Sequence, residues 1–293
     1  MPFGRVLTAM VTPFASDGRV DLDATARLAT ELVDLGNDGL VVNGTTGESP
    51  TTSDTEKADL VRAVVAAVGD RAHVIAGVGT NDTRHSLELI DAAVAAGAHG
   101  LLTVTPYYSK PPQDALIAHF TALADASDLP VMLYDIPGRS AVGLSHDTLL
   151  RLAEHPRIMA NKDAAGDPFA AARVMAETGL IYYSGDDGLN LPLLSIGAAG
   201  FVSVIGHLVA DRLLEMHSAY TAGNVEQARS INAELTPLVV AIMTRTQGVI
   251  AVKAALDLLG RSGGGPLRAP LLPASQSQRE RLAVDLKAAG LVR

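Results

Sequence analysis

The first three quarters of the chain repeat one pattern: a short apolar run followed by an amphipathic stretch. The apolar runs are residues 5–11, 39–43, 74–77, 100–104, 131–134, 158–162, 180–184 and 200–204. The amphipathic stretches are residues 23–35, 54–68, 83–96, 113–126, 146–154, 168–178, 188–196 and 207–222. The runs do not alternate strictly between apolar and polar residues, which is typical of parallel strands that helices cover. The stretches carry apolar residues at helical spacing. Eight strand–helix units predict an α/β fold, a (β/α)8 TIM barrel.

A pair of glycines marks the passage from helix to strand at three of these units. The segments are 35–39, 96–100 and 196–200, and each has one glycine after the helix and another that opens the next strand. The first glycine can adopt the left-handed conformation that ends a helix. The second lets another part of the backbone approach closely.

The pattern changes near residue 223. Residues 225–243, 248–259 and 275–289 have the pattern of helices, and a Gly- and Pro-rich segment, 260–273, separates the last two. We therefore expect a catalytic barrel over residues 1–223 and a C-terminal helical domain over residues 224–293, as an appendage to the barrel.

Composition excludes several classes of protein. The chain has 293 residues, a net charge of −9 and no basic cluster, so we expect no nucleic-acid partner. It has no cysteine, which rules out disulfides, thiolate metal sites and a cysteine nucleophile. The N-terminus lacks the pattern of a signal peptide, and no apolar run is long enough to span a bilayer. We expect a soluble cytoplasmic protein without a membrane partner.

Lys162 is the candidate for covalent chemistry. Of the five lysines, Lys57, Lys110, Lys253 and Lys287 lie in segments with the pattern of exposed helix or loop, whereas Lys162 ends an apolar strand. Burial disfavours the charged form of an amine, and a neutral amine can attack a ketone to form a Schiff base. The alternative is a structural lysine paired with a carboxylate, and this segment alone does not decide between the two.

The ends of the other strands supply polar residues at the face where barrel enzymes carry their active sites. The loop 44–49 is either a turn before a helix, with Ser53 or Asp54 as its cap, or a cradle for a small carboxylate. Tyr134 is either a core aromatic or a proton relay. Arg139 is either a surface residue or a clamp for a substrate carboxylate.

A metal site and a serine nucleophile are both disfavoured. The pair Asp186-Asp187 has no further ligand at a suitable spacing, so we expect one of the two to cap a helix. No serine stands in a nucleophile elbow of the G-x-S-x-G type. We expect no bound metal.

Five strand-end motifs in order resemble those of the dihydrodipicolinate synthase family, a group of pyruvate-dependent Schiff-base aldolases. The motifs are Gly44-Thr45-Thr46-Gly47-Glu48-Ser49, Thr105-Pro106-Tyr107-Tyr108, Tyr134 with Pro137 and Arg139, Lys162-Asp163-Ala164, and Ser184-Gly185-Asp186-Asp187. The resemblance covers essentially the whole chain. One motif would be a weak signal, but five at predicted strand ends are a strong one.

The resemblance implies a role for each matching residue. Lys162 would form the imine with pyruvate, and Thr45 and Thr46 would hold the pyruvate carboxylate. Thr45, Tyr134 and Tyr108 would relay protons, with Tyr108 supplied by a neighbouring subunit. Arg139 would bind the carboxylate of aspartate 4-semialdehyde. Gly185 and Val202 would line the pyruvate pocket.

The resemblance also implies the reaction and the assembly. Pyruvate, activated as the enamine, would condense with L-aspartate 4-semialdehyde in diaminopimelate and lysine biosynthesis, which makes the protein a lyase. No cofactor would be needed, because the covalent imine is the electron sink. The expected partners are the two substrates and further copies of the chain, commonly a dimer of dimers, that is, a homotetramer.

Two features of the chain depart from the family pattern. Asn161 stands where a branched apolar residue is expected; if Lys162 points into the barrel, Asn161 points toward the helices. Lysine-inhibited members carry histidines and a glutamate at an interface site, where this chain has Asp54, Lys57 and His85. We therefore expect weak or absent inhibition by lysine.

Two other functions remain open from the sequence. A sibling aldolase, such as an N-acetylneuraminate lyase or a 2-keto-3-deoxy-sugar-acid aldolase, would use Lys162 and Tyr134 equally well. Arg139 favours the synthase, because a polyol acceptor needs neutral groups there. A non-catalytic barrel that binds a keto acid would not need Lys162.

Overall fold

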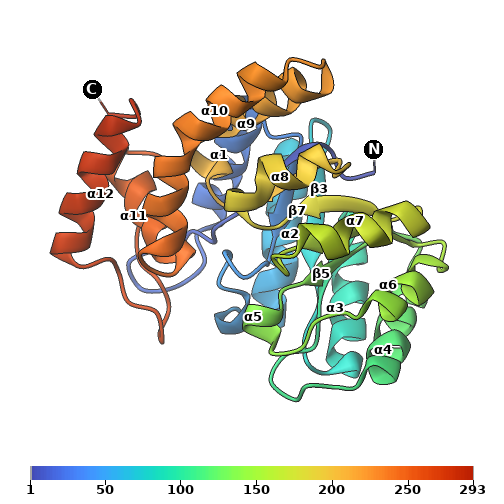
Figure 1. Ribbon diagram of the computed structural model, residues 1–293. Coiled ribbons are helices and arrows are strands. Elements are labelled where there is room, and N and C mark those ends of the chain that lie inside the picture. Colours follow the sequence, from blue (N-terminus) through green and yellow to red (C-terminus); the bar gives the residue numbers. More distant parts are fainter. Residues whose placement is uncertain (1, 293) are drawn as a thin grey trace.

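The computed structural model describes residues 2–292 and forms a closed barrel of eight parallel strands in chain order (Figure 1). The expected TIM barrel is therefore confirmed. The strands are β1 Val6–Ala9, β2 Gly39–Val42, β3 His73–Gly77, β4 Gly100–Val104, β5 Val131–Asp135, β6 Ile158–Asp163, β7 Ile181–Ser184 and β8 Gly200–Ser203.

Helices follow every strand and surround the barrel (Figure 1). They are α1 Leu22–Asp34, α2 Asp54–Val68, α3 Thr83–Ala95, α4 Gln113–Asp125, α6 His146–Ala153, α7 Pro168–Glu177, α8 Asn190–Ser195 and α9 Gly206–Thr221. The short helix α5, Pro137–Ser140, lies between β5 and α6, and single 3-10 turns cover Ser49–Thr51 and Asp187–Leu189.

Three further helices follow the barrel: α10 Val225–Val239, α11 Gly248–Leu258 and α12 Gln276–Ala288. Helix α10 continues as a π-helical turn, Val240–Thr244, where the sequence predicts one α-helix over residues 225–243. Pro237 has no backbone N–H to donate within the helix, and the wider turn begins three residues later. The boundary that we predict between residues 223 and 224 stays a prediction.

The expected element boundaries differ from the observed ones by one or two residues at most ends. Among the strands the largest difference is two residues, at β1, which ends at Ala9 rather than at residue 11. Among the helices it is at α10, which ends at Val239 rather than at residue 243. The expected helix over residues 188–196 begins as the turn Asp187–Leu189 before α8. A strand ends where its ladder of hydrogen bonds ends, and apolar composition alone does not mark that point.

The barrel wall separates two apolar layers. The inner layer includes Phe3, Tyr134, Tyr183 and Val202, and the outer layer lies between the strands and the helices. Because neighbouring residues of a strand point to opposite faces, the strand register decides which layer a residue joins. Lys162 is in register with the inner residues Tyr134 and Tyr183, so its side chain belongs to the barrel interior.

The predicted helix-ending glycines have the expected backbone conformation. Gly36, Gly97 and Gly197 all have positive φ angles, of 111°, 88° and 115°. The strand-opening glycines allow the expected close contacts: a Cβ atom at Gly200 would lie 2.0 Å from the backbone oxygen of Arg5. These positions exclude larger residues for steric reasons.

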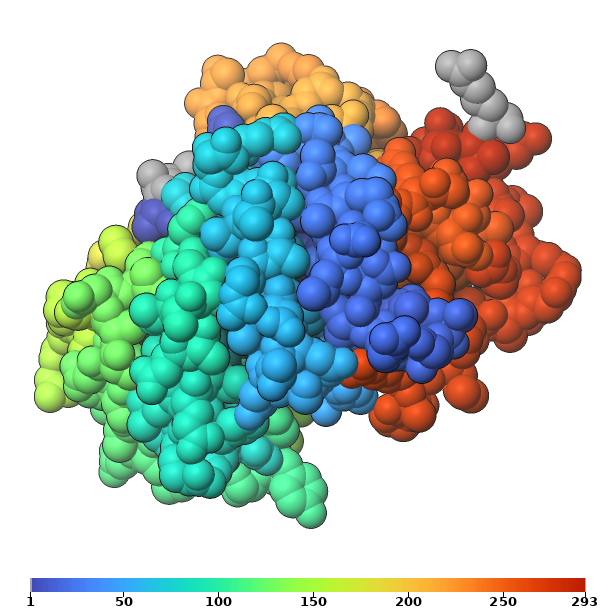
Figure 2. Space-filling view, turned by 180° about the vertical axis from the view of Figure 1, so that it is seen from behind, coloured from blue at the N-terminus to red at the C-terminus, as the bar shows by residue number. Residues whose placement is uncertain are grey.

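The C-terminal helices lie against the N-terminal part of the barrel. Figure 2 shows them, in orange and red, beside the blue N-terminal segments. Hydrogen bonds join the two parts, including one from the Ser262 hydroxyl to Glu31 of α1. In the part of the chain from residue 2 to residue 292, no single helix is long and apolar enough to cross a membrane. Only the pair Val225–Thr244 and Gly248–Leu258, bent by 116°, meets the length and composition criteria together.

Candidate active site

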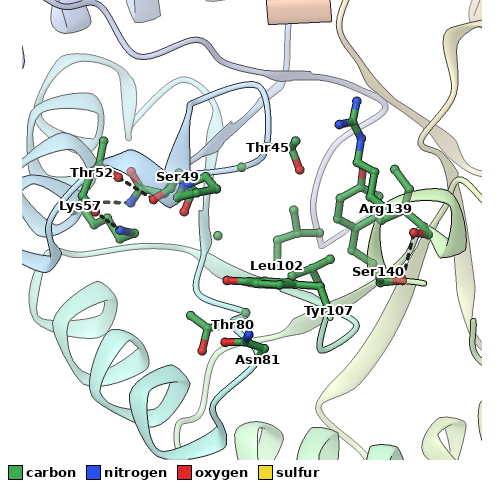
Figure 3. Close-up of a pocket in the computed structure, with 18 of the residues that line it drawn as sticks. Thr45, Ser49, Thr52, Lys57, Thr80, Asn81, Leu102, Tyr107, Arg139 and Ser140 are labelled. Atoms are coloured by element: carbon green, nitrogen blue, oxygen red, sulfur yellow. Dashed lines mark hydrogen bonds between the residues drawn. The ribbon is translucent and has the colours of Figure 1, made fainter. Parts of the chain in front are cut away.

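A cavity of about 350 Å³ opens at the carboxyl ends of the strands. Thr45, Tyr134 and Arg139 line it, which brings three of the predicted site residues together. Figure 3 shows Arg139 at one end of the cavity and Lys57 at the other, with Thr45 between them. The cavity has the position that the active site of a barrel enzyme requires.

Lys162 lies next to this cavity, inside the barrel. Its side chain is 5% exposed, and its Nζ atom lies 3.9 Å from the centre of the Tyr134 ring. Burial lowers the pKa of Lys162 from 10.5 to about 7, with a smaller contribution from Arg139, while the negative charge of Asp187 opposes this shift. A substantial fraction of Lys162 is therefore a neutral amine near pH 7, as a nucleophile must be.

Asp187 is a site residue that the sequence reading missed, because the two adjacent aspartates look alike as helix caps. Asp186 does cap the following turn, by accepting from the Gly188 N–H. Asp187 is instead buried, and it accepts from the Ser203 hydroxyl at 2.5 Å and from the Val204 N–H at 2.8 Å. Burial raises the pKa of Asp187, and these hydrogen bonds oppose that shift. Its negative charge raises the pKa of Lys162 and so opposes the effect of burial there.

Tyr134 presents a phenol to the cavity from the end of β5. Its side chain is 5% exposed, and burial raises its pKa from 10.0 to about 12. The charge of Arg139 and a hydrogen bond with the Thr45 side chain oppose the shift. At neutral pH this phenol holds its proton, so it can donate one to a neighbouring oxygen and take one back through a hydroxyl neighbour.

The loop after β2 is a compact turn closed by its own backbone. The Gly47 N–H donates to the Gly44 carbonyl at 3.0 Å, and the Thr12 hydroxyl donates to the Gly47 carbonyl at 2.6 Å. Thr45 faces the cavity, whereas Thr46, which is buried, is not part of the cavity wall. This geometry offers hydroxyl and N–H donors without a cation, as a carboxylate next to a neutral lysine requires.

The same loop leads into α2, and there the expected cap is confirmed. The Ser53 hydroxyl accepts from the Glu56 N–H, and the Glu56 carboxylate accepts from the Ser53 N–H. This reciprocal pair is a capping box, and it ends the loop at a defined residue.

Gly185 and Val202 are not part of the cavity wall. A Cβ atom at Gly185 would lie 2.9 Å from Cγ of Lys162, so the absence of a side chain leaves the room that the lysine occupies. Val202 is buried in the inner apolar layer and pairs in register with Leu7 of β1. Gly185 therefore adjoins Lys162, whereas Val202 belongs to the inner apolar layer.

Tyr108 is the one predicted site residue that lies away from the others. Its side chain is 89% exposed, and its φ angle is 74°, which is unusual for a residue other than glycine. Tyr107, its neighbour, lines the cavity. Within this single chain, Tyr108 contacts neither Lys162 nor Tyr134 and points into open solvent.

The expectation that only Lys162 is a buried lysine is wrong. Lys57 is 8% exposed and Lys253 is 1% exposed. Lys57 donates to the Thr52 carbonyl, and Lys253 forms an ion pair with Glu48 at 2.6 Å. Both lysines lie on helices, and sequence periodicity does not show that a polar position will be covered, by the turn just before the helix for Lys57 and by a distant loop for Lys253.

Asn161 has the orientation that the alternation of strand residues predicts. It is in register with the outer-layer residues Leu133 and Tyr182, and it is fully buried. Neither its amide nitrogen nor its amide oxygen has a hydrogen bond of good geometry among residues 2–292, although the Tyr182 hydroxyl is near enough to interact with the amide. A buried amide without partners destabilises the folded state.

Comparison with known proteins places the chain in one family. The model of the dihydrodipicolinate synthetase family matches residues 2–289. The 4-hydroxy-tetrahydrodipicolinate synthase 2 of Streptomyces coelicolor is 63% identical over 290 residues, which cover 99% of this chain and 96% of that protein.

Solved structures give the same result. The dihydrodipicolinate synthase of Cyanidioschyzon merolae with lysine bound is 41% identical, with a TM-score of 0.96 and 99% coverage of both chains. The chloride-inhibited enzyme of Acinetobacter baumannii in complex with pyruvate is 36% identical, with a TM-score of 0.94 and coverage of 99% of this chain and all of that one. These relatives favour the synthase over the sibling aldolases and the non-catalytic barrel.

Proposed function

The chain belongs to the dihydrodipicolinate synthetase family, and from this premise we propose that Lys162 forms the Schiff base through which it acts on pyruvate. The protein is an enzyme, a lyase of the pyruvate-dependent aldolase type, with the 4-hydroxy-tetrahydrodipicolinate synthase function of lysine and diaminopimelate biosynthesis. Its substrates are pyruvate and L-aspartate 4-semialdehyde.

One observation carries the assignment to Lys162: its amine is buried, has a pKa of about 7 and lies against the Tyr134 ring. The neutral amine adds to the keto carbon of pyruvate, and the resulting carbinolamine loses water to give the imine. Loss of a methyl proton gives the enamine, whose carbon adds to the aldehyde carbon of the second substrate. Attack by that substrate's amino group then closes the ring and releases Lys162 as an amine.

The neighbouring residues receive roles that match their chemistry. Tyr134 keeps its proton at neutral pH, so it gives a proton to the departing hydroxyl, and Thr45 passes protons to and from it. Thr45 and Thr46 hold the pyruvate carboxylate, while Gly185 and Val202 leave room for its methyl end. Arg139, at the exposed end of the cavity, receives the carboxylate of the aldehyde.

The imine itself takes up the electrons of the forming carbanion, so the proposed reaction requires no metal and no organic cofactor. We propose a cytoplasmic location for the enzyme, since a chain without cysteine suits a reducing compartment.

We further propose that the enzyme acts as an oligomer, at least a dimer and commonly a homotetramer, because Tyr108 needs a second subunit to reach a site. Its exposed ring and its positive φ angle present it to a neighbour rather than to its own Lys162.

A mixed oligomer tests this arrangement. Tyr108→Phe and Lys162→Ala variants are each expected to be nearly inactive. When the two are unfolded together and refolded as mixed oligomers, some sites would combine an intact Lys162 with an intact Tyr108 from the other chain, and activity would return. If the mixture stays as inactive as its components, Tyr108 does not act between subunits.

Reduction with borohydride in the presence of pyruvate tests the covalent step. The wild type and the control Lys287→Ala, which changes an exposed lysine of α12, are expected to gain one pyruvate-derived mass. Lys162→Ala is expected to gain none. An adduct that persists in Lys162→Ala would assign the chemistry to another lysine, and no adduct in the wild type would overturn the proposed mechanism.

A further inference from the structure

A buried ion pair joins the carboxylate-binding loop to the C-terminal helices. Lys253 of α11 and Glu48 of the loop after β2 lie 2.6 Å apart, and both side chains are 1% exposed. The second carboxylate oxygen of Glu48 accepts from the Arg268 N–H at 2.9 Å, and Lys253 also donates to the Pro266 carbonyl at 2.8 Å. The charged groups of both residues therefore have partners on the same C-terminal segment.

The pair is part of a larger connection between that segment and the loop. The Phe14 ring centre lies 4.3 Å from Nζ of Lys253 and 4.4 Å from the guanidinium carbon of Arg268. The Arg268 guanidinium binds the Thr51 carbonyl at 2.7 Å and both oxygens of Glu56, at 2.8 and 2.5 Å. The C-terminal segment thus holds the loop at Glu48 and at the start of α2.

The loop backbone at Glu48 has a conformation that needs such support. Glu48 has a φ angle of 55°, in the left-handed region that residues other than glycine rarely adopt. Its N–H donates to the Thr45 carbonyl at 3.1 Å. The backbone orientation of Thr45 therefore depends directly on the residue that Lys253 holds in place.

Energetics also favour a positioning role over a stabilising one. Two charges removed from water lose hydration, and their attraction often does no more than offset that loss. An apolar pair of similar volume would serve the stability of the fold equally well. A buried ion pair differs from an apolar pair mainly in fixing distance and direction.

We propose that Glu48 and Lys253 are positioning residues that hold Thr45 and Thr46 in the geometry that binds the pyruvate carboxylate. The C-terminal segment then supports the geometry of the active site from outside, because none of its side chains lines the cavity. This inference rests on the proposed role of the loop as the pyruvate site.

The test compares Lys253→Met, Glu48→Gln and the double variant in steady-state kinetics and thermal unfolding. We expect each variant to raise the KM for pyruvate at least tenfold, with a smaller change in kcat and little change in the KM for the aldehyde. The single variant Lys253→Met leaves a buried carboxylate without its partner, so it should unfold at the lowest temperature. The double variant buries no charge and should recover stability without recovering the KM.

The matched control is Asp257→Asn, which breaks the ion pair of Asp257 and Arg279 between α11 and α12. That pair is partly exposed and does not contact the loop, so the KM for pyruvate should stay unchanged. A double variant that folds and keeps the wild-type KM for pyruvate would overturn the inference.

Adduct formation separates this outcome from a failure of the proposed function. With saturating pyruvate and borohydride, the variants should still form the adduct on Lys162, with a shifted half-saturation concentration. An adduct with unshifted half-saturation contradicts the positioning role alone. The absence of an adduct from the wild type as well would contradict the proposed function itself.

Discussion

In the proposed mechanism Lys162 must lose a proton before it can attack pyruvate, so the pH dependence of imine formation should report its pKa. Burial lowers that pKa from 10.5 to about 7, so the neutral form dominates above pH 7 and the ammonium below it. We expect the rate of adduct formation per unit of pyruvate to fall about tenfold per pH unit below pH 7 and to level off above it. Stopped-flow or quenched reactions with pyruvate alone measure this profile.

Arg139 supplies a control for the same profile. Its positive charge contributes to the lowered pKa of Lys162, so Arg139→Gln should move the acidic limb to higher pH. Because the aldehyde is absent from this assay, the role of Arg139 in binding it does not interfere. If the acidic limb of the wild type lies near pH 10, burial does not lower the pKa of Lys162.

Gly185 adjoins Lys162, the proposed nucleophile. In Gly185→Ala, the new Cβ atom would lie 2.9 Å from Cγ and 3.0 Å from Cε of Lys162, so the amine must move. We expect imine formation to slow by about tenfold or more, since small displacements of a reacting group are costly. Gly179→Ala is the matched control, because nothing lies within 4 Å of a Cβ atom there. Equal rates for the two variants would show that Gly185 has no such role.

At the scale of the element, β6 carries Lys162 on its inner face and, on its outer face, the buried amide of Asn161. Asn161→Leu replaces an amide that has no hydrogen bond of good geometry by an apolar side chain with the same branching, in an apolar layer. We expect about 1–3 kcal/mol of added stability, visible as a rise in the unfolding temperature, with unchanged kcat.

Asn161→Asp is the contrasting variant at this position, because it would place an unpaired carboxylate in the same layer and should unfold at a lower temperature. If Asn161→Leu unfolds at or below the wild-type temperature, the amide has partners in solution that offset its burial.

Most elements could be predicted from the sequence, because their signals are local. The Ser53 capping box, the helix-ending Gly36 and the helical spacing of α2 depend on residues within one or two turns of each other. The π-helical turn after Pro237 and the early end of β1 could not be predicted in the same way. Both depend on which backbone groups find partners once the helices and strands have packed.

At the scale of the whole molecule, the cavity extends past the proposed catalytic groups toward a second set of polar residues. Lys57, Asp54 and His85 line that end, and Asp54 pairs with His85 at 3.0 Å. A cationic effector placed there would meet the Lys57 ammonium, and the carboxylate of Asp54 already has a partner. We therefore predict that lysine inhibits the enzyme weakly or not at all, because this end of the cavity does not favour a cation.

An inhibition curve over a wide range of lysine concentrations measures this. The combined change Lys57→His and His85→Glu removes an amine and adds an acid, so it should increase the sensitivity to lysine. Half-inhibition of the wild type at submillimolar lysine would refute the prediction.

The sequence by itself determined the barrel, the order of its elements and the placement of Lys162 at the end of a strand. These features depend on periodicity, capping and short motifs, which neighbouring residues encode together. The same motifs pointed to Thr45, Tyr134 and Arg139, which the structure gathers around one cavity.

Only the tertiary structure decided which charged side chains are buried and which residues are their partners. Glu48 and Lys253 are 205 residues apart in the chain, and Asp187 reaches its partners on β8 and the residues after it only when the barrel closes. A lysine on an amphipathic helix has the same local pattern whether water or another segment covers it. Burial is a property of contacts between distant segments, so no local pattern could show that α11 supports the loop of Thr45.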